Sequence, residues 1–374
     1  MSEEMKNKII NMHNIDNITI NPDIPFVTNF FGKDGKVDIG LMEQWCKTNG
    51  YDYLNKKIKQ RNFTHNVNNI VITDPNGKVV ADMFSKKANY KDDIAEVVVS
   101  RIAKKVGINA VTTYMSNNPT GSKGTIAENG IPAGCKFIEI GDILPDGNND
   151  RNCLLRVFEV IKNIKNSTFG QADPLMQVDP HIYTDLMKLA VFDFCTGQND
   201  RNVFNYGLIY NKEKHTLELG AVWDNGNSFA FDNKYTYRNV STTINAGRFF
   251  SSITQGCGCE ATAQGITDIN DQNFMESIEI LRQIDSPEFA AMVKEYGVDM
   301  KEVISFAESM RQVDVEELNA EAAMTGDFVV PEEETAIISG ILYDRSSKIA
   351  RVLTQSAESY NLLDPSQGGG QGDD

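Results

Sequence analysis

The chain has 374 residues, of which 41% are hydrophobic and 24% are charged, and its formal net charge is -16. This size allows a sizeable core and predicts more than one lobe. The acidic balance argues against nucleic acid and anionic membranes as partners, because both attract basic surfaces. No stretch approaches the length of a membrane span, and the opening residues MSEEMKNKIINMHN contain no apolar signal core.

Six cysteines are scattered along the chain, and Cys135 and Cys195 lie in apolar runs. We interpret them as reduced, and we therefore expect a cytoplasmic protein. Cys257 and Cys259 form the only close pair of cysteines in the sequence. A metal or redox site there is an alternative, but no second cluster of cysteine or histidine accompanies the pair.

The first predicted elements follow an N-terminal extension, residues 1–60, in which we recognise no chemistry. Residues 68–87 read NNIVIT, then DPNG, then KVVADMFSKK, which predicts two strands joined by a tight turn. Apolar residues recur at three- and four-residue steps through 90–107, which indicates an amphipathic helix. Further strands are expected at 108–116 and 134–144.

Together these elements predict a small α+β lobe over residues 61–145, with a mostly antiparallel sheet and one helix. The loop between its last two strands contains PTGSKG at 119–124. This run invites a phosphate-loop interpretation. It lacks the full spacing of a P-loop and does not open a helix, so we interpret it as a hairpin tip.

A larger, mainly helical lobe is predicted over residues 146–363. Helices are expected at 149–166 and 179–197, the second with Asp179 and Pro180 as its N-cap and first residue. The sequence then predicts two short strands, followed by helices from about residue 268 onward. These strands are at 206–211 and 217–225. The tail, 364–374, is expected to be disordered because it is polar and rich in Gly.

A polar loop, GQNDRNVFN at 197–205, lies between a buried-looking helix and the first of these strands. The carboxylate of Asp200 can accept a proton from an attacking hydroxyl, and the amide oxygen of Asn205 can bind a divalent cation. Asp224 ends the second strand and supplies a carboxylate for the same cation. Magnesium takes one or two protein oxygens together with phosphate and water. This order is the catalytic arrangement of protein-kinase-like enzymes.

The run TGQNDRNVFNYGLIYN…LELGAVWDNGNSF resembles the catalytic segment of the atypical kinases related to the HipA toxin kinases. It also resembles that of the phosphatidylinositol 3- and 4-kinases. The resemblance covers about residues 68–230 and implies a two-lobed, protein-kinase-like fold. It implies that Asp200 is the catalytic residue and that Asn205 and Asp224 bind Mg²⁺. We count Arg201 among the catalytic residues, because we expect it to hold the loop in place.

The resemblance also implies nucleotide-binding residues in the small lobe. A strand should carry a Lys that holds the ATP phosphates, and Lys86 and Lys87 both lie at the end of the predicted hairpin. We prefer Lys86. The helix that follows should carry a Glu that pairs with this Lys, which is Glu96. A later strand should end along the adenine, at Glu139 and Ile140.

Two departures from these families keep an alternative open. The chain has no G-x-G-x-x-G loop, and Asn202 stands where both families usually have His. Alone, D-x-x-x-x-N is a frequent pattern, Asp224 is typical of an Asx turn, and Lys86 and Glu96 are ordinary surface charges. The order of all these residues along the chain favours the kinase interpretation.

The sequence therefore predicts an ATP- and Mg²⁺-dependent phosphotransferase. The resemblance implies a protein Ser/Thr hydroxyl as the acceptor rather than an inositol lipid, with a protein substrate as the partner. The alternatives are a catalytically weak pseudokinase that only binds nucleotide or a partner, and nucleotidyl transfer on the same scaffold.

Overall fold

The structure is a computed structural model of the chain. It describes residues 18–58, 67–87, 90–117, 123–144, 154–198, 201, 204–226, 228–230, 259–262, 265–268 and 284–363. The described residues form two compact units. Unit 1 takes them from 1–100, 111–129 and 316–331, and unit 2 takes them from 101–110, 130–315 and 332–374. The α+β class is confirmed, whereas the domain boundaries derived from the sequence stay predictions.

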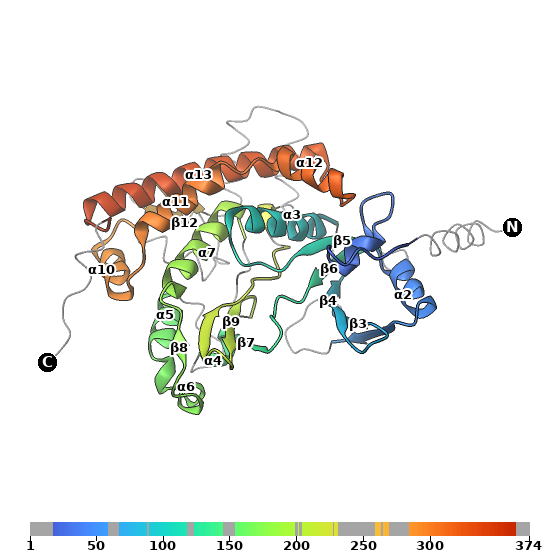
Figure 1. Cartoon of the computed structure of the whole chain (residues 1–374). Helices are drawn as coiled ribbons and strands as arrows, with labels where there is room; N and C mark the ends of the chain where they lie inside the picture. Colours follow the sequence, from blue (N-terminus) through green and yellow to red (C-terminus); the bar gives the residue numbers. More distant parts are fainter. Residues whose placement is uncertain are drawn as a thin grey trace. The chain divides into compact units, whose positions relative to one another are not determined.

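Among the described residues of unit 1, six strands form one sheet in the order β1-β5-β6-β4-β3-β2 (Figure 1). Neighbouring strands are antiparallel except for β1 and β5, which are parallel. The predicted hairpin is confirmed as β3 and β4. The strands are β1 (Val37–Asp38), β2 (Asp52–Lys57), β3 (Val67–Thr73), β4 (Val79–Lys86), β5 (Thr113–Asn117) and β6 (Lys123–Glu128).

The described part of the N-terminal extension belongs to this sheet, which the sequence analysis did not predict. Strands β1 and β2 are the two edges of the sheet. The segments η1 (Phe26–Phe30), which precedes β1, and α2 (Ile39–Thr48), which follows it, pack an aromatic cluster against the sheet. The rings of Phe30 and Trp45 lie 5.7 Å apart. The edge strands escaped prediction because β1 has only two residues and β2 is exposed and polar.

The predicted amphipathic helix is confirmed as α3 (Tyr90–Val106). Its apolar positions, among them Ile94, Val97 and Val98, are fully or almost fully buried. The helix also buries charged residues, including Asp93 and Glu96. Because buried charges need partners, Asp93 and Glu96 must face polar or basic groups.

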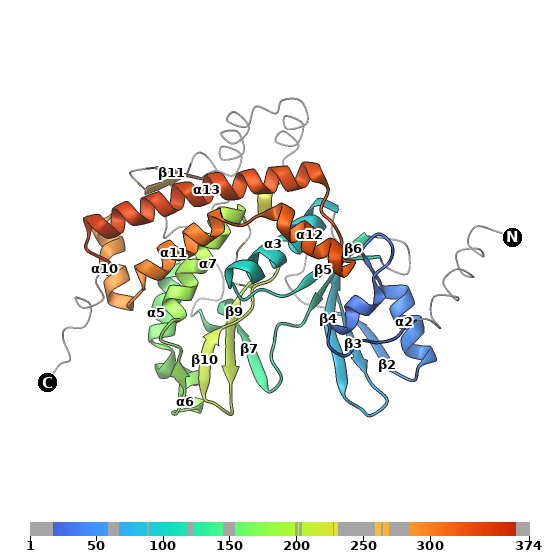
Figure 2. The same cartoon turned by 45° about the horizontal axis from the view of Figure 1, so that its top comes forward.

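Unit 2 contains a smaller sheet in the order β7-β9-β10-β8, of which Figure 2 shows β7, β9 and β10 side by side. Strand β7 corrects the sequence analysis, which placed residues 134–144 in the sheet of the small lobe. It pairs with β9, and the residues after Glu139 form a helix. Strand patterns cannot specify a partner so far along the chain. The elements are β7 (Cys135–Glu139), α4 (Ile140–Ile143), β8 (Gln177–Val178), β9 (Gly207–Asn211) and β10 (Thr216–Leu219).

Helix α7 (Ile182–Thr196) is almost entirely buried in unit 2. Helices α11 (Met300–Arg311) and α13 (Glu332–Ser359) both contact α7 and run beside each other (Figures 1 and 2). The other helical elements of this unit are α5 (Leu154–Lys162), η2 (Ile164–Asn166), α6 (Thr168–Ala172), η3 (Ser228–Ala230) and α10 (Pro287–Tyr296). Two further strands, β11 (Cys259–Thr262) and β12 (Gly265–Asp268), form an antiparallel pair. Helix α12 (Val315–Thr325) belongs mostly to unit 1.

The predicted start of α7 is wrong by a few residues. Asp179 is not the N-cap, because the helix begins at Ile182 and His181 occupies the cap position. The Asp179 carboxylate instead accepts a hydrogen bond from the His181 N–H at 2.9 Å. Asp179 and Pro180 therefore belong to a turn that precedes the helix.

Several expectations concern residues that the structure does not describe. They are the helical segment at 269–283, the tail at 364–374 and Cys257 of the close cysteine pair. Cys46, Cys135 and Cys195 are free thiols. In the described parts of the chain, every helix is too short or too polar to cross a bilayer.

Candidate functional site

The C-terminal end of α7 determines where the polar loop begins. Gly197 has a left-handed backbone with φ 65°, a conformation that glycine adopts without steric cost. Its N–H donates to the carbonyl of Phe194 at 3.3 Å, and the N–H of Gln198 donates to that of Asp193 at 2.9 Å. These two bonds form a Schellman motif. The helix therefore ends at a defined residue, and hydrogen bonds hold Gly197 and Gln198 against its last turn.

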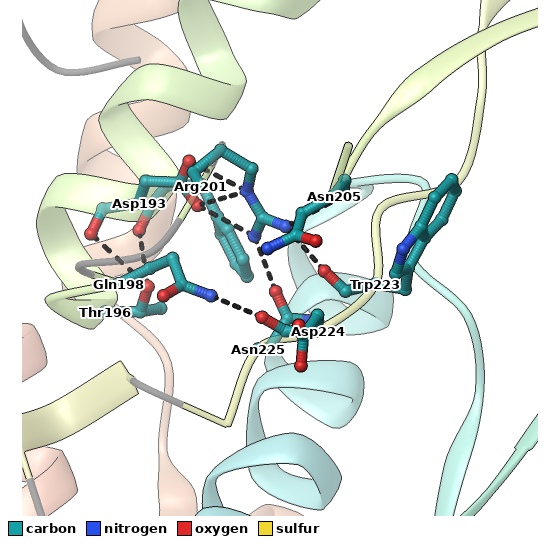
Figure 3. A network of polar contacts seen from close by, with 9 residues as sticks. Asp193, Thr196, Gln198, Arg201, Asn205, Trp223, Asp224 and Asn225 are labelled. Atoms are coloured by element: carbon teal, nitrogen blue, oxygen red, sulfur yellow. Dashed lines mark hydrogen bonds and ion pairs between the residues drawn. The ribbon is translucent and has the colours of Figure 1, made fainter. Parts of the chain in front are cut away.

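Arg201 lies at the centre of a polar network in unit 2 (Figure 3). The residue is buried, and its guanidinium group has five N–H donors. The acceptors come from α7, from the loop before β9 and from the segment after β10. They are Asp193 Oδ2 (3.1 Å, from Nε), Asp193 Oδ1 (3.0 Å, from Nη2), Asn205 O (3.2 Å, from Nη1), Trp223 O (2.7 Å, from Nη1) and Asn225 Oδ1 (2.5 Å, from Nη2).

The ion pair between Arg201 and Asp193 is completely buried, because both side chains are 0% exposed. Such a pair is stable only when further hydrogen bonds satisfy both groups. The sequence analysis did not single out Asp193. A signal was present, because Asp193 is an acidic residue in the apolar run LAVFDFC, and a buried carboxylate needs a cation nearby.

The network brings the two predicted metal ligands, Asn205 and Asp224, together. Asn205 is buried, and its main-chain carbonyl accepts hydrogen bonds from Arg201 and, at 3.4 Å, from the N–H of Trp223. Asp224 is only half-buried, and its carbonyl accepts the side-chain amide of Gln198 at 2.9 Å. Both residues are thus held through their main chains at the base of the β9–β10 hairpin.

The donor chemistry of these two residues fits magnesium. Asn205 offers an amide oxygen and Asp224 a carboxylate, and Mg²⁺ prefers oxygen ligands. Within the described ranges there is no group of three or more His, Cys, Asp or Glu residues placed to hold a metal ion. Magnesium does not need such a group, because phosphate and water complete its coordination.

The predicted catalytic residue, Asp200, lies outside the described residues, and so does Asn202. Arg201, between them, is described and is fixed by the network. The role of Asp200 stays a prediction.

In unit 1, the last residue of β4, Lys86, forms an ion pair with Glu96 of α3. Lys86 Nζ lies 3.1 Å from Glu96 Oε1, and the side chains are 17% and 6% exposed. Lys87 is exposed. Of the two lysines that the sequence left open, Lys86 therefore makes the contact with Glu96, whereas its role in binding nucleotide stays a prediction.

Gly124, the last residue of the PTGSKG motif, lies next to this lysine. Residues 118–122 are not described, but the flanking strands β5 and β6 are an antiparallel pair, as expected for a hairpin. A Cβ atom at Gly124 would lie 2.4 Å from the main-chain oxygen of Lys86. Glycine is therefore required at this position for β6 to approach the end of β4.

The predicted adenine-contacting residues, Glu139 and Ile140, lie where β7 passes into α4. Ile140 is buried, and its N–H donates to the carbonyl of Tyr206 at 3.3 Å. Burial, and then the nearby carboxylate of Asp142, raise the pKa of Glu139. The structure does not test whether either residue contacts a nucleotide.

No protein-family model matches the chain, and no curated protein matches it. Among solved structures, the chain is similar to the proinflammatory kinase CtkA of Helicobacter pylori. That similarity has 14% sequence identity and a TM-score of 0.48, and it covers 78% of this chain and 94% of the kinase.

A second similar structure is the HipA toxin of Shewanella oneidensis MR-1, in a complex with HipB and its operator DNA. The identity is 12%, the TM-score is 0.41, and the similarity covers 83% of this chain and 66% of the toxin chain. At these identities and TM-scores, neither similarity assigns an activity. The chain is thus similar in structure to a kinase and to a HipA toxin, and the loop motif resembles the kinases related to HipA.

Proposed function

We propose that the chain is an ATP- and magnesium-dependent phosphotransferase whose acceptor is a Ser or Thr hydroxyl of a protein. The observation that carries this proposal is the ion pair between Lys86 and Glu96, at 3.1 Å. The resemblance of the polar loop implies such a pair far upstream in the sequence, and the two residues meet in the structure. The network around Arg201 supports the proposal further, because it fixes Asn205 and Asp224 at one end of a hairpin.

In the proposed reaction, the hydroxyl oxygen of the acceptor attacks the γ-phosphorus of ATP. The bond between that phosphorus and the β–γ bridging oxygen breaks, and ADP leaves. Asp200 accepts the proton of the hydroxyl. Lys86 binds the phosphates, and Glu96 positions Lys86. Asn205 and Asp224 would hold Mg²⁺, which neutralises phosphate charge when bound. Positioning and charge neutralisation supply most of the rate in such reactions.

The test is to incubate the chain with a mixture of proteins, Mg²⁺ and ATP labelled at either the γ- or the α-phosphate. We expect protein labelling from the γ-phosphate alone, with phosphoserine or phosphothreonine after acid hydrolysis. The variant Asp200→Ala should lose this labelling. The matched control is Glu213→Ala, which removes an exposed carboxylate from the turn of the β9–β10 hairpin and should label like the wild type.

Other outcomes identify the alternatives. Labelling from the α-phosphate indicates nucleotidyl transfer. Binding of ATP without any transfer, unchanged in Asp200→Ala, indicates a pseudokinase. Either result would overturn the proposed reaction.

A further inference from the structure

Gln198 directly follows Gly197, the capping residue at the end of α7. Its main-chain N–H completes the Schellman motif, and its side chain is 0% exposed. From this fixed point, the side-chain amide donates Nε2–H to the main-chain carbonyl of Asp224, at 2.9 Å. The sequence analysis assigns no role to Gln198, although its amide reaches the backbone of a predicted metal ligand (Figure 3).

The backbone of Asp224 is in an uncommon conformation. Its φ is 57°, in the left-handed region. Residues other than glycine adopt this region at a cost in free energy, and they keep it where the surrounding structure holds them. The backbone conformation also sets the direction in which the carboxylate leaves the chain. Whatever holds this conformation therefore sets the direction of the carboxylate.

Three consecutive residues are held from the loop that follows α7. Arg201 donates to the carbonyl of Trp223 and to the side chain of Asn225. The carbonyl of Asp224, the residue between them, accepts a hydrogen bond from the side-chain amide of Gln198. The charged guanidinium thus fixes the two neighbours, and the neutral amide fixes the carbonyl of Asp224 itself.

We propose that Gln198 is a positioning residue for the metal ligand Asp224. By holding the Asp224 carbonyl, it maintains the left-handed backbone that directs the carboxylate toward Mg²⁺. This inference rests on the proposed function, in which Asp224 binds the metal. Gln198 acts through the backbone of Asp224 and touches neither ATP nor the acceptor. Its loss should therefore weaken the magnesium-dependent part of ATP binding and leave the metal-independent part unchanged.

The test compares Gln198→Met with Thr196→Val in the full chain. Methionine keeps the length of the side chain but removes the N–H donor. Thr196 is also wholly buried at the end of α7, but its hydroxyl donates only within the same helix, to the carbonyls of Phe192 at 3.0 Å and Asp193 at 3.5 Å. Thr196→Val therefore removes a buried hydrogen bond that does not reach Asp224. Calorimetry gives the Kd of ATP with Mg²⁺ and with a chelator.

We expect Mg²⁺ to tighten ATP binding by the wild type and by Thr196→Val to the same degree. In Gln198→Met this tightening should be about tenfold smaller, the effect of losing roughly one hydrogen bond. The Kd measured with the chelator should be the same for all three proteins. If Gln198→Met does not fold, Gln198→Asn keeps the amide but is too short to reach, and it should show the same loss.

The outcomes separate the two proposals. If Mg²⁺ does not tighten ATP binding by the wild type, the proposed function fails, and the role of Gln198 fails with it. If Mg²⁺ tightens binding equally for the wild type and the Gln198 variant, only the role of Gln198 is overturned. A loss that is equal with and without Mg²⁺ would show that Gln198 merely stabilises the fold.

Discussion

The two units each place a cation beside a buried carboxylate, and the two pairs differ in exposure. In unit 1, Lys86 and Glu96 are 3.1 Å apart, and the lysine is 17% exposed. In unit 2, Arg201 and Asp193 are 3.0 Å apart, and neither is exposed. Lysine carries a compact charge on a flexible stem, whereas arginine presents a rigid fork of donors.

This difference shows that basic residues beside a predicted site can have different roles. The Lys86 side chain is partly exposed, so it is not sealed inside its unit. All the donors of Arg201 point to groups of its own unit, where they connect three segments of the chain. We therefore infer that Lys86 is suited to bind a charged ligand and that Arg201 acts by positioning the loop.

The largest expected effect is on stability, from Arg201→Met. This change leaves the Asp193 carboxylate buried without its cation, so the free energy of unfolding should fall by about 3–5 kcal/mol. Urea denaturation measures the loss. The double variant Asp193→Leu/Arg201→Met should lose less than Arg201→Met alone, because it leaves no buried charge. A loss below about 1 kcal/mol in Arg201→Met would contradict the role of a buried brace.

The next largest effect is on phosphotransfer, from Lys86→Ala. We expect the rate to fall roughly a hundredfold, which is about 2.7 kcal/mol in activation free energy. The reason is that the variant lacks the positive charge that binds the phosphates in the proposed reaction. Lys87→Ala is the matched control, since Lys87 is adjacent and exposed. Rates of γ-phosphate transfer should distinguish the two variants. Equal losses in both would show that Lys86 has no special role.

A third prediction concerns the metal end of unit 2. Asparagine tolerates the left-handed backbone at position 224, so Asp224→Asn removes the negative charge without adding much strain. ATP at about 30 times its Kd should stabilise the wild type by about 2 kcal/mol when Mg²⁺ is present. Asp224→Asn should lose the magnesium-dependent part of this gain in thermal unfolding.

The control for Asp224→Asn is Glu218→Gln, because Glu218 is an exposed carboxylate on the same hairpin. It should keep the full gain. If Asp224→Asn keeps the gain as well, Asp224 is not a metal ligand.

The smallest effect is expected from Glu139→Gln. Burial raises the pKa of Glu139 in the folded chain. The contribution of Glu139 to stability is therefore full below the pKa of the unfolded chain, about 4.3. It is lost as the pH rises through the pKa of the folded chain. At pH 7 the variant should therefore be more stable than the wild type by less than about 1 kcal/mol. It should accordingly melt at a higher temperature. Near pH 4 the two melting curves should coincide. A lower melting temperature at pH 7 would contradict this interpretation.

Local patterns predicted the elements that depend on near neighbours in the sequence. The β3–β4 hairpin follows from alternating residues around DPNG, and α3 follows from its helical period. The pairing of β7 with β9 and the two edge strands β1 and β2 could not be predicted in this way. The partners of β1 and β7 are distant in the sequence, and β2, which pairs with the next strand along the chain, is exposed and polar.

The same limit applies to the candidate site. The resemblance predicted a contact between a lysine and Glu96, because both have fixed places in the motif order. It gave no sign of Gln198, because an amide that reaches a carbonyl 26 residues away leaves no pattern in the sequence. Asp193 could have been found as an acid within an apolar helix. Its partner follows only from the course of the loop.

The β9–β10 hairpin has a consequence for finding similar chains. Asn205 precedes β9 and Asp224 follows β10, so strand register and the bonds at the base bring them together, whatever the length of the turn that joins the two strands. The exposed turn at 212–214 can therefore change length without moving either residue. An insertion within 220–223 would rotate Asp224 away. A sequence pattern for such proteins should fix the two arms of the hairpin and leave the length of its turn free.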